Sequence, residues 1–346
     1  MDDEPLGPCD RNFAEHTRHL FVEVAQARAI AGGARPARRA VFRKCHGVAH
    51  GRLELDPGRP DSLRHGIFAG DAYDVWARFS SDVRPTASDA DNGTIGIGLK
   101  LFGVTGPTLA AHDPAAPTAD LILQNHPVFF VDTGKDMCVF TDLSLQGKSE
   151  DWFERHPETK RILEEMTKFE ASVLSATYWS VLPYACGVAS AVKYRLLPEA
   201  SGPSRAPEGD TNRLRTDLAA RLKDEAVGFT LALQVPRPGW TPDLERATQD
   251  WPEQEAPFQP VGRVTFDVQD VATEGQESYG ETLAFSPWRV PEANRPLGSI
   301  AESRRLTYPA SMAQRYQVNG TPVAEPHRGR PPRLQLPLED GGSNDG

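Results

Sequence analysis

Three residues near the C-terminal end of the chain have types and spacing suited to binding a metal-containing group. Arg304, Tyr308 and Arg315 lie in the segment RPLGSIAESRRLTYPASMAQRYQ. On a helix, offsets of four and eleven residues return to nearly the same face. Permanent positive charges beside a phenol favour the phenolate, which binds a hard ferric ion. Pro309 would begin or kink the helix there and so direct the tyrosine. The spacing is also compatible with a surface helix that carries ordinary basic residues.

Other motifs that carry chemistry are weak or absent. His46 and His50 are four residues apart, but KCHGVAHGRLEL contains two glycines and runs into a strand pattern, so packing or surface histidines are expected there. The glycines of GTIGIG lie within a strand pattern and lack the spacing of a dinucleotide-binding turn. The sequence has no GxSxG, HExxH or Walker A motif and no EF-hand loop.

Composition limits the class of protein. The 346 residues are 39% hydrophobic and 25% charged, which suits a globular chain with one large core or two medium ones. The net charge of −10 and the lack of a sustained Lys/Arg cluster disfavour nucleic acid and anionic membranes as partners. No apolar run is long enough to span a bilayer, and the acidic start MDDEPLGPCDRNF predicts a cytoplasmic protein. The four scattered cysteines predict free thiols.

Hydrophobic patterns place these residues on one α+β domain, about residues 1–320. Ile95, Ile97, Leu99 and Leu101 alternate strictly, and Gly96 and Gly98 on the other face leave room for something to approach. The expected elements are a helix over about 12–31, strands over 48–131 and 190–270, helices over 150–184 and 297–318, and an extended or disordered tail over 321–346. Two sets of about four strands with no linker between them predict a sizeable antiparallel barrel.

With these elements in view, the sequence resembles the haem catalases. The pattern RxxxY followed by Arg seven residues later is similar to their proximal haem signature. Three further segments resemble catalase segments in the same order: RRAVFRKCHGVAHGRLEL (38–55), WARFSS (76–81) and DLILQNHPVFFVD (120–132). YWSVLPYACGVASAVKY (178–194) and FSPWRVPEANRPLG (285–298) look like the shorter, divergent catalase-related haem proteins. The resemblance covers about residues 35–320.

The resemblance implies a catalase-like fold, with an eight-stranded antiparallel barrel, surrounding helices and a C-terminal helix that ligates haem b. It implies Tyr308 as the axial iron ligand and Arg304 as the residue that holds it as phenolate. It further implies Arg39, Arg78 and Arg315 at the haem propionates or edge, Val41 and Phe79 as haem walls, and Asn125 as the distal hydrogen-bond donor.

One departure from the family pattern affects the expected chemistry. The catalases carry their distal histidine three residues after the first of these arginines, and here that position is Phe42. Phenylalanine cannot move the proton that peroxide cleavage requires. His46, or His50, could replace it as the distal base, or Phe42 could make the pocket apolar and favour a larger organic substrate.

These features predict a haem-dependent oxidoreductase that acts on hydrogen peroxide or an organic hydroperoxide, with weak catalase activity. The alternatives are a specialised haem enzyme of secondary metabolism, such as a dehydratase or oxygenase, a true catalase with another distal base, and a non-catalytic haem sensor or carrier. The chain is short in the regions with which catalases form intertwined tetramers, so the resemblance implies a homodimer.

Overall fold

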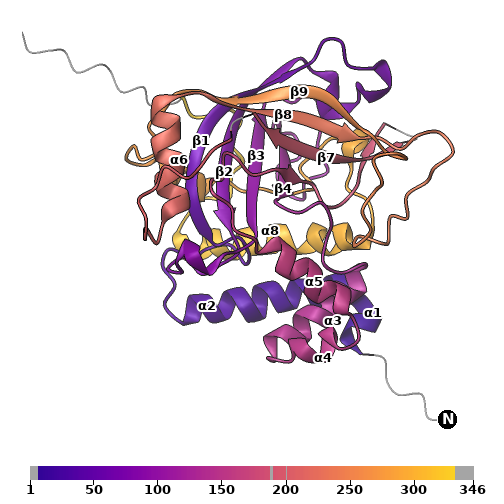
Figure 1. Cartoon of the computed structure of the whole chain (residues 1–346). Coiled ribbons are helices and arrows are strands. Elements are labelled where there is room, and N and C mark those ends of the chain that lie inside the picture. Colours follow the sequence, from indigo (N-terminus) through magenta and orange to yellow (C-terminus); the bar gives the residue numbers. More distant parts are fainter. Residues whose placement is uncertain (1–6, 188–189, 200, 332–346) are drawn as a thin grey trace, which may run out of the picture.

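A closed antiparallel β-barrel forms the body of the protein in the computed structural model, which describes residues 7–187, 190–199 and 201–331 (Figure 1). The strands are β1 (Lys44–Leu55), β2 (Ala72–Ser81), β3 (Ile95–Phe102), β4 (Thr118–Gln124), β5 (Tyr178–Trp179), β6 (Tyr184–Cys186), β7 (Ser190–Pro198), β8 (Val227–Gln234) and β9 (Phe258–Phe266). Their order is β5-β4-β3-β2-β1-β9-β8-β7-β6, and β5 also pairs with β7. This second pairing closes eight strands into a cylinder, while β6 extends only from β7, so the predicted eight-stranded barrel is confirmed.

The apolar core fills the interior of the barrel. The alternating residues of β3, Ile95 to Leu101, are buried in one cluster with Val227, Phe229, Leu231 and Leu233 of β8. Side chains alternate between the two faces of a strand, so the intervening residues of β2, β3 and β4 point to the outside of the barrel. The outer face of these three strands is therefore free to form one wall of a site.

Helices lie on the outside of the barrel (Figure 1). They are α1 (Pro8–Arg18), the π-helical η1 (His19–Gln26), α2 (Ala27–Ala31), α3 (Gly134–Leu145), α4 (Ser149–Phe153), α5 (Pro157–Met166), α6 (Arg213–Asp224), α7 (Gln276–Thr282) and α8 (Ser299–Asn319). Short 3₁₀ turns occur at η2 (Asp61–Leu63), η3 (Gly66–Ala69), η4 (Asp89–Asp91) and η5 (Glu292–Asn294). In Figure 1, α8 runs along one end of the barrel and the layer of α1 to α5 lies on its far side, in contact with it through α1, η1 and α3. Helix α6 lies against β1.

The helices differ in detail from those predicted. The N-terminal helical run begins at Pro8 rather than near residue 12, and the predicted helical region 150–184 contains α4 and α5 but also the strands β5 and β6. Helix α3 was not predicted, although its start has a local signal. The Thr133 hydroxyl accepts a hydrogen bond from the backbone of Asp136, whose carboxylate accepts one from the backbone N–H of Thr133.

Helix α8 is close to its predicted bounds. Pro309 lies inside it and removes one intrahelical hydrogen bond, but the helix continues to Asn319. It ends at Gly320, whose φ of 66° is the left-handed conformation that glycine adopts without steric cost.

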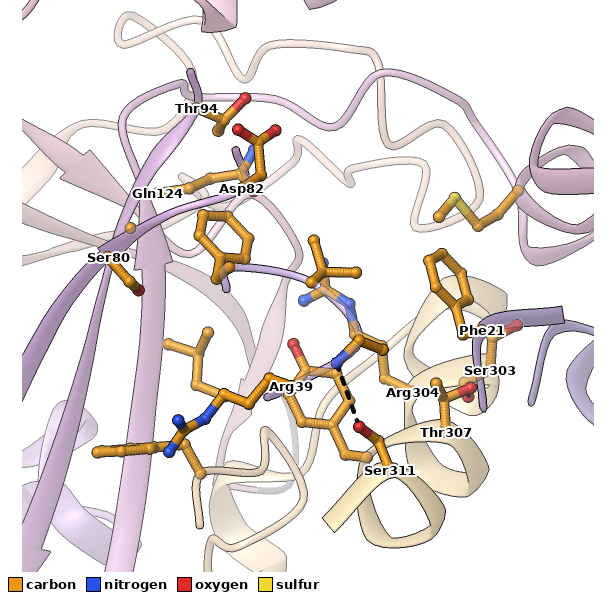
Figure 2. Close-up of a pocket in the computed structure, with 18 of the residues that line it drawn as sticks. Phe21, Arg39, Ser80, Asp82, Thr94, Gln124, Ser303, Arg304, Thr307 and Ser311 are labelled. Atoms are coloured by element: carbon orange, nitrogen blue, oxygen red, sulfur yellow. Dashed lines mark hydrogen bonds between the residues drawn. The ribbon is translucent and has the colours of Figure 1, made fainter. Parts of the chain in front are cut away.

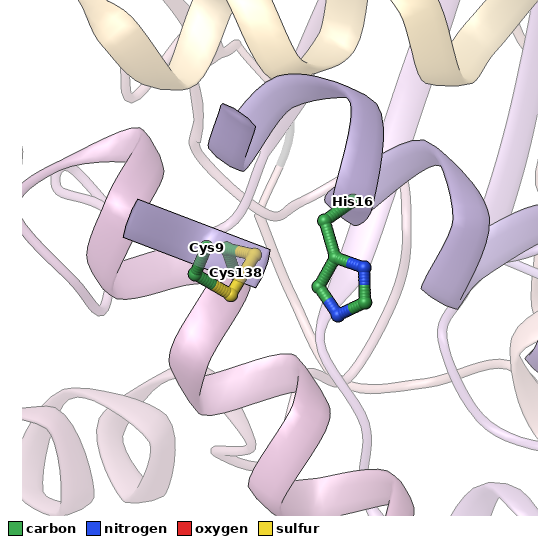
Figure 3. Close-up of side chains that lie close together, drawn as sticks. All are labelled: Cys9, His16 and Cys138. Carbon is green, nitrogen blue, oxygen red and sulfur yellow. A yellow bond between two sulfur atoms is a disulfide. The ribbon is translucent and has the colours of Figure 1, made fainter. Parts of the chain in front are cut away.

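The prediction of four free thiols is wrong for two of the cysteines. Cys9 of α1 and Cys138 of α3 form a disulfide across a sequence separation of 129 residues, and only Cys45 and Cys186 are free. Figure 3 shows the ring of His16 beside the disulfide. One ring nitrogen and the two sulfur atoms all lie within 4.8 Å of one another, but the sulfurs are joined and are not thiolate ligands for a metal. The pairing depends on α1 packing against α3, which sequence spacing does not reveal.

The described part of the C-terminal tail, residues 321–331, is extended and bound to the barrel. Glu325 forms ion pairs with Lys100 and Arg289 and accepts a hydrogen bond of 3.0 Å from the Thr118 hydroxyl. The carbonyl of Arg330 accepts a bond of 3.0 Å from the indole of Trp76. Residues 332–346 of the predicted tail lie outside the described residues. Among the described helices, none combines the length and the apolar character that crossing a membrane requires.

Candidate functional site

A pocket of about 470 Å³ lies between the outer face of the barrel and the helices. Its lining residues come from six places. They are Thr17 and Phe21 of the N-terminal helices; Arg39, Ala40, Val41 and Phe42; Arg78, Ser80, Asp82, Thr94, Gly96, Ile97, Gly98, Ile122, Leu123 and Gln124 of the barrel wall; Phe129, Phe130, Met137, Phe140, Thr141, Ser144, Leu145, Leu163 and Met166; Ala284 and Phe285; and Ile300, Ser303, Arg304, Thr307, Tyr308, Ser311, Met312 and Arg315 of α8. Figure 2 shows the barrel residues on one side and those of α8 on the other.

The tyrosine and two arginines singled out by their spacing face this pocket together. Arg304, Tyr308 and Arg315 all line it from α8, so the predicted common helical face is confirmed. The Arg304 guanidinium also lies 5.3 Å from the centroid of the Phe129 ring, an approach typical of a cation–π contact. Tyr308 is only partly buried, so its phenol is accessible from the pocket.

Positive charge is concentrated at the edge of the pocket near α7. Glu281 forms ion pairs with Arg39 at 2.9 Å, with Arg78 at 3.1 Å and with Arg38 at 3.3 Å. Arg315 donates to the backbone carbonyl of Glu281. Three guanidinium groups therefore pair with one carboxylate, and a fourth binds the backbone of the same residue. We call Arg38, Arg39, Arg78, Arg315 and Glu281 the arginine cluster.

The arginine cluster has more positive charge than its own carboxylate can compensate. Burial, with Arg78 and Arg315 close by, lowers the pKa of Arg39 to about 9. Among the described atoms, the buried Nε of Arg315 has no hydrogen-bond partner. A buried cation is stable only when it is paired and hydrogen-bonded, so this edge of the pocket is built to receive additional negative charge.

Glu281 is expected to stabilise the ligand-free protein in a pH-dependent way. Burial raises the pKa of Glu281, but Arg39, Arg78, Arg38 and Arg315 outweigh it and bring the pKa from 4.5 to about 2. A carboxyl whose folded-state pKa is depressed stabilises the fold above its unfolded-state pKa, and the stabilisation is lost as the pH falls toward the folded-state pKa. We therefore expect Glu281→Gln to lower the free energy of unfolding by about 3 kcal/mol near neutral pH.

Urea unfolding of the ligand-free protein at several pH values measures this effect. The difference between wild type and Glu281→Gln should shrink between about pH 4.5 and pH 2. Glu302→Gln is the matched control, because Glu302 is 45% exposed and pairs with the half-exposed Arg305, away from the arginine cluster. An equal loss of stability in both variants, or a loss that does not vary with pH, would contradict the assignment.

Phe42 lines the pocket and has an unusual backbone conformation. Its φ is 53°, in the left-handed region, and its carbonyl accepts a hydrogen bond of 3.1 Å from Arg78. A Cβ atom at Gly96 would come within 2.8 Å of the Phe42 ring, and one at Gly98 would come within 3.0 Å of the Phe285 ring. The space predicted beside these two glycines is therefore filled by the two aromatic rings.

Three of the residues predicted for the site do not line the pocket. Phe79 points into the barrel core, with its ring centroid 5.5 Å from that of Phe266. His46 is fully buried beside the Ser81 hydroxyl at 3.0 Å, and burial lowers its pKa to about 3. His46 is therefore not a distal base. It also forms no metal pair with His50, because both lie on strand β1 and His50 bonds to Asp74 instead.

Asn125 is also directed away from the pocket. Its amide donates to the carbonyl of Met166 at 3.3 Å and to Glu170 at 3.1 Å, and its oxygen accepts from the backbone N–H of Ile95 at 3.2 Å. Its role is therefore to hold the end of β4 in place. The preceding residue, Gln124, is the amide that lines the pocket.

The polar lining residues that sequence reasoning missed include four on the barrel side of the pocket: Ser80, Asp82, Thr94 and Gln124. The sequence contains a signal for two of them, Ser80 and Asp82. Because Arg78 was placed at the site, alternation along the same strand puts positions 80 and 82 on the same face. The other predicted residues, Arg39, Val41 and Phe42, do line the pocket.

The cover of the pocket is apolar. Phe21 of η1, Met137 and Phe140 of α3, and Leu163 and Met166 of α5 face the barrel wall across it. Such a lining favours an apolar or aromatic ligand body, with polar groups only at defined points.

The fold of this barrel with its surrounding helices is catalase-like. In support, the chain is 28% identical over 315 residues to the catalase-related peroxidase of Mycolicibacterium paratuberculosis, which covers 85% of this chain and 94% of the relative. The structure matches a fungal catalase with a TM-score of 0.64 at 17% identity, over 98% of this chain and 74% of that one. It also matches a bacterial catalase with a TM-score of 0.64 at 15% identity, over 92% of this chain and 67% of that one. No family model matches the sequence.

Proposed function

We propose that this protein is a haem-dependent oxidoreductase that acts on an organic hydroperoxide. The observation that carries the proposal is that Tyr308 and the arginine cluster meet at one apolar pocket. Haem b is a flat apolar macrocycle that needs an axial iron ligand and bears two carboxylates. The residues present fit each part of it. The name of the catalase-related peroxidase and the fold of the catalases support the same cofactor and a peroxide substrate.

The residues that would hold haem follow from this fit. The Tyr308 oxygen would bind the iron, since a hard anionic oxygen favours ferric iron. Arg39, Arg78 and Arg315 would bind the propionates, whose negative charge matches the excess positive charge of the arginine cluster. Arg304 lies one helical turn before Tyr308 and lines the same pocket from α8. When bound, haem supplies the iron centre at which a peroxide is activated.

The wall opposite α8 determines which peroxide is suited to the pocket. Phe42 places an aromatic ring where the catalases have a histidine, and it has no nitrogen to accept a proton. The helical cover adds further apolar surface from η1, α3 and α5. Together they favour an organic hydroperoxide over hydrogen peroxide, and they disfavour a true catalase.

Purified protein supplied with haem during expression tests the proposal. We expect a Soret band, reduction of cumene hydroperoxide or a fatty-acid hydroperoxide with a phenolic electron donor, and only slow oxygen evolution from hydrogen peroxide. Rapid oxygen evolution would identify a true catalase. Haem binding without turnover of any peroxide would favour the dehydratase class or a sensor or carrier, and absence of a Soret band would reject the cofactor.

Two further expectations from the sequence stay predictions. A homodimer is one of them. A cytoplasmic location is the other, and the Cys9–Cys138 disulfide weighs against it, because disulfides persist mainly in oxidising compartments.

A further inference from the structure

Asp82 contributes a carboxyl group to the lining of the pocket, and it is not one of the residues that would hold haem. It directly follows β2 and continues the alternation of Arg78 and Ser80 on the outer face of the barrel. Its backbone N–H donates to the carbonyl of Thr94 at 3.1 Å, which extends the β2–β3 pairing by one step. The backbone of Asp82 is therefore anchored at the end of β2 by this hydrogen bond.

The neighbours of Asp82 leave its carboxyl group available for proton transfer. The neighbouring pocket residues Thr94, which directly precedes β3, and Gln124, which ends β4, are uncharged, and Thr94 donates hydrogen bonds to Asp82. The cation whose charge reaches it is Arg43. Burial outweighs these interactions and raises the pKa of Asp82 above its ordinary value. A raised pKa moves a carboxyl toward the range in which it both accepts and donates protons near neutral pH.

Asp82 and Gln124 lie at the part of the pocket opposite α8. Figure 2 shows Thr94, Asp82 and Gln124 together at one end of the pocket, while Arg304, Thr307 and Ser311 lie at the other. In the sheet, Gln124 is opposite Gly96, the residue against which the Phe42 ring packs. The Gln124 amide thus lies beside the ring that stands in place of a histidine, and Asp82 lies at the same end of the pocket.

We propose that Asp82 is the catalytic acid–base residue on the Phe42 side of the pocket, with the Gln124 amide as the hydrogen-bond donor that orients the substrate. This rests on the proposed function. In the step assigned to it, the O–H bond of the hydroperoxide breaks and the O–H bond of the Asp82 carboxylic acid forms. The bonding electron pair stays on the hydroperoxide oxygen, so the product is the hydroperoxide anion and only a proton moves. Hydrogen cyanide, a weak acid that binds ferric haem as its anion, has to lose a proton in the same way.

Cyanide binding to the haem-loaded protein, followed by the Soret band, tests the assignment without turnover. In the wild type, the association rate should fall as the pH drops through the raised pKa of Asp82. In Asp82→Asn the rate should be lower by roughly 10²-fold, the lower end of what general acid–base catalysis contributes, and independent of pH in that range. Imidazole binds without losing a proton, so its affinity should be unchanged. Asp91→Asn is the matched control, since Asp91 is an exposed aspartate on η4 outside the pocket.

Each outcome separates this proposal from the proposed function. A normal Soret band with an unchanged cyanide rate and pH profile in Asp82→Asn overturns the role of Asp82 and leaves haem binding intact. Equal losses for cyanide and imidazole would show a purely structural role and also overturn it. If Asp82→Asn fails to retain haem, cyanide binding to Asp82→Glu is measured instead. This variant keeps a carboxyl group, so its cyanide association rate must still fall as the pH drops. A wild type without a Soret band rejects the proposed function and this proposal with it.

Discussion

Tyr308→Phe is expected to abolish stable haem binding. The phenylalanine ring keeps the shape of the side chain in α8 but lacks the oxygen that would ligate the iron. Residues that only support a metal ligand already change metal affinity by about 10–100-fold, so loss of the ligand itself should reduce haem content by at least that factor. Soret absorbance per mole of protein, with haem counted by pyridine haemochrome, measures the effect.

A second tyrosine provides the control for this experiment. Tyr279 of α7 lies outside the pocket, where its hydroxyl accepts a hydrogen bond of 3.2 Å from the backbone of Arg330. Tyr279→Phe should therefore retain haem with an unaltered spectrum. Full haem occupancy and an unchanged spectrum in Tyr308→Phe would remove Tyr308 as the ligand, even if Arg39 and Arg78 still bind the propionates.

Phe42→His is expected to raise the rate of hydrogen peroxide disproportionation. An imidazole at this position would supply an acid–base group on the wall opposite α8. The backbone can accept it, since histidine adopts the left-handed region more readily than most residues and Phe42 already has a φ of 53°. The gain should lie within roughly 10²–10⁴-fold, the range that a positioned acid–base group contributes, and at its lower end if the ring is poorly oriented. Initial oxygen evolution measures it.

Phe42→Leu separates the chemistry of the new base from the space that it opens. Leucine also removes the aromatic ring that packs on Gly96, but it adds no proton acceptor. It should leave oxygen evolution at the wild-type level. An equal gain in both variants would mean that access, rather than proton transfer, limits the reaction. Rapid oxygen evolution by the wild type itself would show that Phe42 does not limit catalase activity.

Strict alternation and helical spacing predicted much of this structure. The apolar residues of β3 and β8 lie in the barrel core as their period of two indicated. The face shared by Arg304, Tyr308 and Arg315 was likewise predicted correctly, because a helix repeats every 3.6 residues whatever surrounds it.

Predictions failed where a residue was assigned to the wrong face or beyond the end of its strand. β4 ends at Gln124, so Asn125 lies beyond the regular strand, and its amide turns to Met166 and Glu170. In a strand, an error of one residue exchanges the pocket face for the buried face. The same physical reason explains Phe79, which follows the pocket-lining Arg78 and therefore points into the core.

The sequence by itself determined the chemical groups available and the faces of the regular elements on which they lie. Only the tertiary structure decided which distant groups meet. Glu281 reaches Arg39 across 242 positions, Cys9 pairs with Cys138 across 129, and Asp82 faces Gln124 only because β2, β3 and β4 are neighbours in the barrel wall. Local periodicity depends on backbone geometry within one element. Contacts between elements depend on barrel closure and helix packing, and these are set by the apolar core as a whole.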